Sequence, residues 1–467
     1  MSDVAFLPAV EQARLLRARE LSPVELAETY LARIERLDAE LNAYVTVTTE
    51  RALADARAAE ARLAGGGDLP PFLGVPLAIK DLTSTAGVRT TFSCRAYADN
   101  VPTVDSAVSR RLRDAGFTLL GKTNTPELGT SPVTESALNG ACRNPWDLGR
   151  TPGGSSGGAA AALAAGLCAV AEGSDGGGSI RIPASCCGLF GLKPSRGRVS
   201  QAPYASVDGL GTSGPLARTV RDAAALLDVL AGYETGDPWW APPPERPFAE
   251  EPGRAPGRLR VGWAAVPPPP AAVHFDCLAA LEDAVALLEE LGHDVREVRP
   301  DWHDEELMHL FTTIWQVSPG LYPLEDTTVL SPLNRALLES ALRTPSPRYA
   351  AALFRVRTIA RRVVTLWEEI DVLLTPTLAL PPVPVGWHDE PDDPWEQWRR
   401  GAEFTPFTPI ANVTGQPAAS LPLWWSAEGL PIGVQLVGPP AGDALLLRLC
   451  AQVEEARPWA QRRPPVS

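Results

Sequence analysis

Short apolar segments with the pattern of buried strands alternate with amphipathic helical patterns along this chain. The first helix opens at the capping box SPVE (22–25), which has proline at the first helical position. This alternation predicts an α/β fold in which helices sandwich one twisted, mixed and mostly parallel sheet. Strands are predicted at 73–81, 117–120, 168–171, 259–263, 418–423 and 433–437, and helices at 22–37, 50–63, 106–114, 156–167, 219–230, 278–291, 349–369 and 444–455.

Neither an internal repeat nor a charged linker divides the chain. We therefore expect one large domain over residues 1–467, with its core at about 70–235. Many of the 47 prolines cluster at 241–269 and 376–394, which predicts long ordered loops. We expect the segment at about 236–405 to be an irregular flank that forms the substrate pocket or a lid.

Charge and composition exclude several classes of protein. The formal net charge of −14 and the lack of a basic block argue against a nucleic-acid partner. The longest run of small apolar residues, 159–171, is shorter than the roughly 20 residues that span a bilayer, so no membrane partner is expected. The N-terminal residues lack the pattern of a secretion signal, which favours a cytoplasmic protein. Seven cysteines without CxxC spacing and five unclustered histidines predict neither disulfides nor a metal site.

The motif GFTLLGKT at 116–123 matches the phosphate-loop pattern GxxxxGK[ST]. A phosphate loop follows a strand and opens a helix, whereas 117–120 itself has the pattern of a strand and Pro126 comes soon after it. We therefore expect no nucleotide site at this motif.

The motif GGSSGG at 153–158 satisfies the GxSxG pattern of an α/β-hydrolase nucleophile through Ser155 or Ser156. That esterase alternative needs a partner histidine, for which His388 is a candidate. It explains neither Lys80 nor the glycines before Ser179.

The segment GSDGGGSIRIPAS at 173–185 places three glycines directly before Ser179. Without β-carbons, the main chain of Gly176, Gly177 and Gly178 can approach a substrate closely, so that backbone N–H groups stabilise an oxyanion. One such donor contributes on the order of 3 kcal/mol in a transition state. A flexible turn is the alternative interpretation of these glycines.

Lys80 ends the apolar run 75–79, where burial would lower the pKa of its amine. A serine nucleophile needs a base, and a lysine with its ordinary pKa of about 10.4 can serve only if that value falls by about three units. The alternative is a solvated or ion-paired lysine at the end of a strand.

Taken together, these segments resemble the amidase signature family. The resemblance rests on PLAIKD (76–81) and on the serine- and glycine-rich motifs 153–158 and 173–181. It extends over nearly the whole chain through NGACRNPWD (139–147), GLFGLKP (188–194), NVTGQPAASLP (412–422) and GVQLVG (433–438). Several long motifs in the same order are more specific than any one of them.

The resemblance implies that Ser179 is the nucleophile, that Ser155 is a second serine preceded by a cis peptide bond, and that Lys80 is the base. Ser155 would relay a proton from Ser179 to Lys80, and the main chain of 176–179 would form the oxyanion hole. The resemblance also implies an acyl-enzyme intermediate, cleavage of amide, ester or carbamate bonds, and no cofactor. Many members carry a β-carbon where this chain has Gly176, so we expect a roomier oxyanion hole.

Further candidates surround these residues. Ser156, Asp175 and Arg181 are expected to support the nucleophile, the latter two most simply as an ion pair. The candidate substrate contacts are Thr130, Asn139 and Trp395, and 387–401 is a candidate lid.

The version of the nucleophile motif at 173–185 and the segment GDPWWAPPP (236–244) indicate a subclass. Both look more like stand-alone bacterial amidases that act on aminohexanoate oligomers, aryl amides or urethanes. The alternative is the glutaminase-type subunit of a tRNA-dependent amidotransferase. We therefore expect a small-molecule amide substrate, and the sequence leaves a monomer or a homodimer open.

Overall fold

A computed structural model describes residues 4–204 and 207–467. One mixed sheet of eleven strands runs through this part of the chain, in the order β1-β3-β2-β6-β8-β7-β12-β13-β11-β9-β10. Two further short strands, β4 and β5, pair only with each other. The strands are β1 (Tyr44–Val47), β2 (Pro76–Lys80), β3 (Thr118–Thr123), β4 (Glu135–Ser136), β5 (Gly140–Ala141), β6 (Val170–Asp175), β7 (Phe190–Lys193), β8 (Thr212–Ala217), β9 (Arg260–Trp263), β10 (Asp294–Glu297), β11 (Val372–Pro376), β12 (Ala418–Trp425) and β13 (Pro431–Val437).

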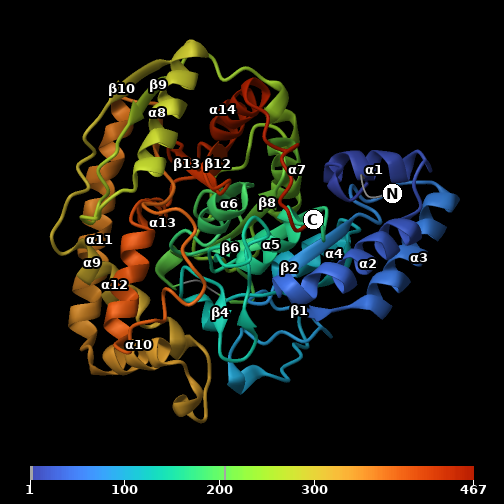
Figure 1. Ribbon diagram of the computed structural model, residues 1–467, viewed down its shortest axis with the longest axis horizontal. Coiled ribbons are helices and arrows are strands. Elements are labelled where there is room, and N and C mark those ends of the chain that lie inside the picture. Colours follow the sequence, from blue (N-terminus) through green and yellow to red (C-terminus); the bar gives the residue numbers. More distant parts are fainter. Residues whose placement is uncertain (1–3, 205–206) are drawn as a thin grey trace.

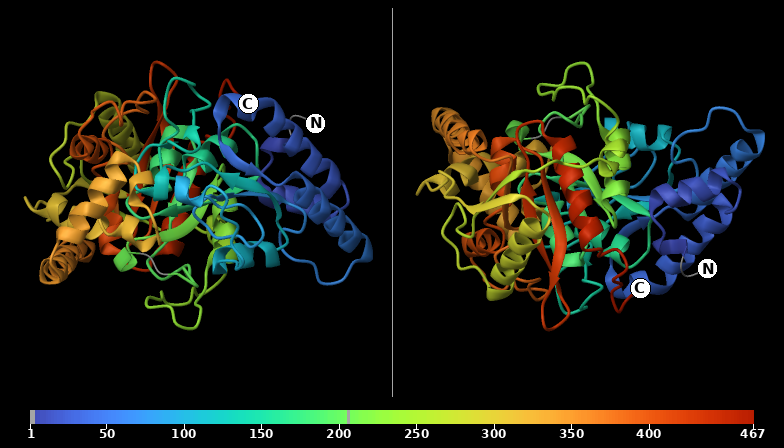
Figure 2. Two further views of the ribbon diagram at one scale, coloured as in Figure 1. Left: turned by 90° about the horizontal axis from the view of Figure 1, so that it is seen from below. Right: turned by 90° about the horizontal axis from the view of Figure 1, so that it is seen from above.

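Helices lie around the sheet and at both ends of the long axis of the molecule. Helices α1 to α3 lie at one end and α9 to α12 at the other (Figure 1). Two further views show the same separation (Figure 2). The helices are α1 (Ala9–Arg17), α2 (Pro23–Leu41), α3 (Thr49–Gly65), α4 (Ala107–Asp114), α5 (Gly157–Ala164), α6 (Arg181–Cys187), α7 (Val220–Leu230), α8 (Phe275–Glu290), α9 (Leu307–Trp315), α10 (Pro332–Arg343), α11 (Ser346–Val364), α12 (Pro394–Phe404), α13 (Pro409–Thr414) and α14 (Asp443–Ala456).

The mixed sheet agrees with the α/β expectation, and its parallel pairs lie on its two flanks. β2 runs parallel to β3 and β6, and β9 runs parallel to β10 and β11. Between these groups, β8, β7, β12 and β13 run antiparallel to their neighbours. Helices α4 and α8 provide the crossovers that parallel neighbours need, whereas β12 and β13 are joined by the short turn 426–430. The expectation of a mostly parallel sheet is therefore wrong for its centre.

The phosphate-loop match at 116–123 lies within this sheet. Gly121 and Lys122 belong to β3, and Lys122 is fully buried. Its Nζ donates to the main-chain oxygen of Thr83 and, at 3.1 Å, to Oγ1 of Thr85. The lysine is therefore held by protein oxygens inside a strand, and the expectation that this motif is not a phosphate loop is confirmed.

The flank at 236–405 is less irregular than expected, because it contains β9, β10, β11 and α8 to α12 and completes one edge of the main sheet. It also supplies residues such as Phe311 and Trp398 to a pocket, as expected. The proline clusters at 241–269 and 376–394 lie largely in loops, as expected, whereas Pro332 and Pro394 lie in the first turn of α10 and α12. Proline is tolerated there because the first helical N–H groups have no partner within the helix.

All seven cysteines are buried free thiols, in agreement with the expectation that the chain has no disulfide framework. Among residues 4–204 and 207–467, no helix combines the length and the apolar character needed to cross a bilayer.

Candidate active site

Lys80 and Ser155 form a direct hydrogen bond in the interior. Lys80 is the last residue of β2, and its Nζ donates to Oγ of Ser155 at 2.7 Å. The same Nζ lies 3.1 Å from Oγ of Ser174 and 3.4 Å from its main-chain oxygen. Lys80 is fully buried, and the peptide bond between Gly154 and Ser155 is cis. The structure therefore brings together two of the three predicted catalytic residues.

Ser179 lies beside these residues, in the connection between β6 and α6. Its main-chain oxygen accepts a hydrogen bond from the N–H of Ser156 at 3.1 Å. The hydroxyl of Ser156 in turn donates to the main-chain oxygen of Ser174 at 3.2 Å. The segment 153–156 is thus tied to the segment 174–179, and Ser156 has the supporting position that the sequence predicted.

The glycine segment before Ser179 needs at least one glycine for its backbone. Gly178 has a φ of +131°, and a β-carbon there would lie 2.3 Å from Oγ1 of Thr408. The hydroxyl of Thr408 donates to the main-chain oxygen of Gly177 at 2.7 Å. Residues from α13 and its N-terminal flank therefore approach the segment closely on one side.

A buried ion pair between Asp175 and Arg181 holds the segment around Ser179 in place. Nε and Nη2 of Arg181 each lie 2.9 Å from a carboxylate oxygen of Asp175. The same carboxylate accepts from the N–H of Gly178 at 2.8 Å and from the N–H of Ile180 at 3.2 Å. Burial opposes ionisation, but Arg181 holds the pKa of the Asp175 carboxyl well below its usual range. Both charged groups are therefore occupied within the protein.

The predicted oxyanion hole needs one correction. The N–H of Gly178 donates to Asp175, so it is already engaged. This leaves the N–H groups of Gly176, Gly177 and Ser179 as the candidate donors.

The position of Gly176 is not roomier than that of a residue with a β-carbon. An ideal β-carbon there would lie 2.9 Å from Cη2 of Trp315. The indole of Trp315 stacks on Phe311 at a centroid distance of 5.6 Å. An aromatic pair from α9 therefore occupies the space that the missing side chain leaves, and the expectation of a looser oxyanion hole is wrong.

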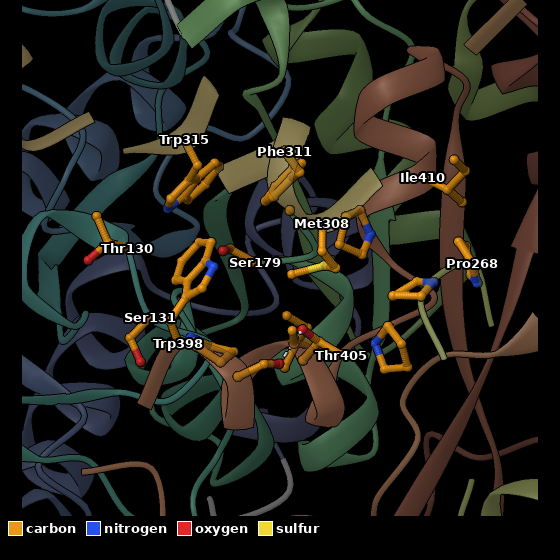
Figure 3. A pocket seen from close by; sticks show the side chains of 18 of the residues that line it. Thr130, Ser131, Ser179, Pro268, Met308, Phe311, Trp315, Trp398, Thr405 and Ile410 are labelled. Carbon is orange, nitrogen blue, oxygen red and sulfur yellow. Dashed lines mark hydrogen bonds between the residues drawn. The ribbon is translucent and has the colours of Figure 1, made fainter. Parts of the chain in front are cut away.

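A pocket opens in front of Ser179 (Figure 3). Its interior volume is about 90 Å³, room for several water molecules, since one needs roughly 10–15 Å³. None of its lining residues is Asp, Glu, Lys or Arg, so the pocket is largely apolar. The lining residues are Thr130, Ser131, Pro132, Gly177, Ser179, Ile182, Pro268, Pro269, Leu307, Met308, Phe311, Trp315, His388, Trp398, Gly401, Ala402, Thr405, Pro406, Pro409, Ile410 and Val413.

Of the three predicted substrate contacts, one lines the pocket and two do not. Thr130 lines the pocket, with its hydroxyl donating to Oδ1 of Asn334 at 2.7 Å. Asn139 is not among the lining residues, and its amide donates to Oγ of Ser93 at 2.9 Å. Trp395 also lies outside the lining and is 40% exposed, whereas Trp398 on the next turn of α12 faces the pocket.

Helix α9 supplies pocket residues that the sequence analysis missed. Leu307, Phe311 and Trp315 are spaced four residues apart, and all three line the pocket. This spacing is the signal that could have predicted a helix with one face toward a pocket.

The side chains of His388 and of Ser155 or Ser156, which the esterase alternative pairs, are each bonded to other groups. Nδ1 of His388 lies 2.6 Å from Oδ1 of Asp389, whereas the hydroxyl of Ser155 is bonded to Lys80 and that of Ser156 to Ser174. His388 still lines the pocket. Among residues 4–204 and 207–467, no three His, Cys, Asp or Glu side chains cluster closely enough to bind a metal ion.

The electrostatics of the site favour an uncharged lysine. Burial lowers the pKa of Lys80 to about 7, although the charges of Glu172 and Asp175 oppose this shift. Glu172 is fully buried next to Lys80. Its carboxylate accepts from the N–H of Lys80 at 3.2 Å and from Oγ1 of Thr83 at 3.1 Å. At neutral pH a large share of the Lys80 amine is therefore free to accept a proton.

Comparisons with known proteins agree on one family. The model of the Amidase family matches residues 25–447. The 6-aminohexanoate-cyclic-dimer hydrolase of Paenarthrobacter ureafaciens is 38% identical over 485 residues, covering 98% of this chain and 96% of that protein. A solved structure of 6-aminohexanoate cyclic dimer hydrolase superposes with a TM-score of 0.93 at 37% identity, over 99% of both chains. A bacterial aryl acylamidase of the Amidase signature enzymes gives a TM-score of 0.88 at 28% identity, over 98% of this chain and 97% of that one.

We predict that kcat/KM for an uncharged amide falls on the acidic side of about pH 7. The pKa of Lys80 is about 7, so the amine is protonated and unable to accept a proton below that pH and is free above it. Glu172→Gln removes a buried negative charge that favours the protonated amine, so the midpoint moves to lower pH. The measurement is a kcat/KM profile on both sides of pH 7. Glu454→Gln, a change of a largely buried carboxyl on α14, is the control and leaves the midpoint in place. An upward shift or no shift in Glu172→Gln contradicts the prediction.

We also predict that Gly176→Ala destabilises the protein and lowers its activity, because the new methyl group overlaps Trp315. Overpacking of this kind costs about 1–3 kcal/mol. In a Trp315→Ala background the same change becomes nearly neutral for the free energy of unfolding. The control is Gly253→Ala, since no atom lies within 4 Å of a β-carbon there. Equal costs of Gly176→Ala in the two backgrounds, measured by denaturant unfolding, would exclude the proposed contact.

Proposed function

This chain belongs to the Amidase family, and from that premise we propose that it hydrolyses apolar amides through Ser179, Ser155 and Lys80. The family and the match to 6-aminohexanoate-cyclic-dimer hydrolase make the protein an amide hydrolase. The roles of the three residues and the kind of amide are the parts that we propose.

The observation that supports the proposal most directly is the 2.7 Å hydrogen bond between Nζ of Lys80 and Oγ of Ser155 in a fully buried setting. A neutral Lys80 accepts the hydroxyl proton of Ser155, and Ser155 accepts the proton of Ser179 as the latter attacks the carbonyl carbon. The lysine can therefore act as base without touching the nucleophile.

The attack converts the carbonyl oxygen into an oxyanion of a tetrahedral intermediate. We assign the N–H groups of Gly176, Gly177 and Ser179 as its donors, each contributing about 3 kcal/mol. Collapse breaks the C–N bond, and the amine leaves with the proton that Lys80 returns through Ser155. Water then attacks the ester on Ser179, its proton follows the same relay, and the acid is released.

The pocket supports an apolar substrate. Phe311, Trp315, Trp398 and Met308 surround Ser179, and no lining residue is Asp, Glu, Lys or Arg (Figure 3). Alkyl and aryl groups bury their surface in such a pocket at a gain of about 25 cal/mol per Å². We propose aryl and alkyl amides, including aminohexanoate-type oligomers, with carbamates cleaved by the same chemistry.

The same feature argues against the glutaminase alternative. Glutamine carries an ammonium and a carboxylate beside its amide, and burying an unpaired charge costs several kcal/mol. The described pocket offers no Asp, Glu, Lys or Arg to pair with them.

We predict that Ser179→Ala and Lys80→Met each lower kcat/KM by about a thousandfold or more, because residues of a catalytic triad act as a unit. The measurement is turnover of a panel with one acyl group and amide, anilide, ester or carbamate leaving groups. Losses across the whole panel tie all four reactions to one site.

Lys193→Met is a matched control, since Lys193 is also fully buried, with a pKa near 7, and donates to the main-chain oxygen of Pro194. It keeps turnover. An active Ser179→Ala variant would contradict the proposal.

We further predict that the purified chain alone hydrolyses hexanamide and an acetanilide and leaves glutamine unchanged. Hexanamide places an alkyl group in the apolar pocket, whereas glutamine has to bury two charges there. The measurement is release of ammonia from hexanamide and from glutamine, and release of aniline from the acetanilide. Turnover of glutamine at a rate close to that of hexanamide would favour the subunit alternative.

A further inference from the structure

Within the described part of the chain, the pocket lining contains two buried nitrogens that no protein group satisfies. Most polar groups of the lining are engaged: Thr405 Oγ1 donates to the oxygen of Gly401 at 3.0 Å, and Trp398 Nε1 donates to Thr312 at 2.8 Å. Nε2 of His388 and Nε1 of Trp315 have no hydrogen-bond partner. His388 is 1% exposed, and a buried polar group without a partner destabilises the protein unless a ligand satisfies it.

The contact that Nδ1 of His388 makes determines whether Nε2 is a hydrogen-bond donor or acceptor. Nδ1 lies 2.6 Å from Oδ1 of Asp389, a distance at which the N–H donates to the carboxylate. In the neutral imidazole the other nitrogen, Nε2, then carries the lone pair. The group that satisfies it must therefore be a hydrogen-bond donor.

A glycine in the middle of a helix leaves this nitrogen uncovered. Gly401 lies within α12, where alanine has the higher helix propensity. Its φ is not in the left-handed region, so the backbone does not require glycine. A β-carbon at 401 would lie 3.5 Å from Nε2 of His388 and 3.2 Å from Cγ of Pro132. It would thus cover the free nitrogen on the side of the pocket.

The free nitrogen is not engaged by the reacting groups. The hydrogen bond of the His388 ring goes to Asp389, whereas Lys80 bonds to Ser155 and Ser174. Because His388 and Ser179 line the same pocket, we assign the donor that reaches Nε2 to a part of the substrate outside the scissile amide.

We propose that Nε2 of His388 accepts a hydrogen bond from a second N–H group of the substrate, so that the enzyme selects amides carrying a further amide N–H along the chain. This inference rests on the proposed function and names the substrate class within it. His388 is then a specificity-determining residue, with Asp389 holding its tautomer and Gly401 keeping it accessible.

The test compares two anilides with the same scissile bond: 6-acetamidohexananilide and 6-acetoxyhexananilide, in which oxygen replaces the distal N–H. Aniline release gives kcat and KM for both. The wild type favours the acetamido compound about tenfold in kcat/KM, mainly through KM. His388→Leu brings the ratio of the two kcat/KM values close to one. His388→Gln, whose side-chain oxygen can accept a hydrogen bond, restores part of the preference.

A second variant tests access to Nε2 without changing His388, in case His388→Leu fails to fold. Gly401→Ala covers Nε2, so it also lowers the ratio, and a melting temperature measured in parallel reports whether Pro132, 3.2 Å from the new β-carbon, accommodates it. Arg399→Ala, an exposed change on α12, is the matched control and keeps the wild-type ratio.

Two results overturn the inference: a wild-type ratio near one with both compounds hydrolysed, or an unchanged ratio in both His388→Leu and Gly401→Ala. If the wild type hydrolyses neither anilide, the proposed function is contradicted instead. Calorimetric binding of the same two compounds to wild type and His388→Leu then still decides the role of His388.

Discussion

The proposed mechanism depends on keeping one amine, that of Lys80, uncharged inside the protein. Lys80 lies at the end of a buried strand, where water cannot solvate an ammonium group, and burial outweighs the attraction of Glu172 and Asp175. A fully apolar setting would leave the amine without a partner, and a closer carboxylate would keep it protonated. The hydroxyls of Ser155 and Ser174 satisfy the amine without adding charge.

The nucleophile segment depends on a different interaction, the buried pair of Asp175 and Arg181. Asp175 fixes the segment by accepting the N–H groups of Gly178 and Ile180. Arg181 continues the network to Oδ1 of Asn412 at 2.6 Å. Breaking such a pair leaves an uncompensated buried charge, which costs about 3–5 kcal/mol. The segment of the proposed nucleophile and the amine of the proposed base are thus held mainly by different contacts.

The sequence predicted local features better than contacts between distant segments. The cap at Ser22, the strand before Lys80 and the motif around Ser179 are encoded within a few residues, and each lies where it was expected. Strand order and the antiparallel centre depend on pairings that no local pattern records. The packing of Trp315 on Gly176 also escaped prediction, because it joins α9 to a loop far away in the sequence. Helix α6 was missed since it is short and contains Pro183.

The network around Arg181 also bears on how the protein is made. Its partners Thr408, Asn412 and Gln435 are the last part of the site to be synthesised, long after the nucleophile segment has left the ribosome. Until then the guanidinium and Asp175 lack the groups that surround them in the finished protein. The hydrogen-bond network that holds the proposed nucleophile segment can therefore be completed only when translation is nearly finished.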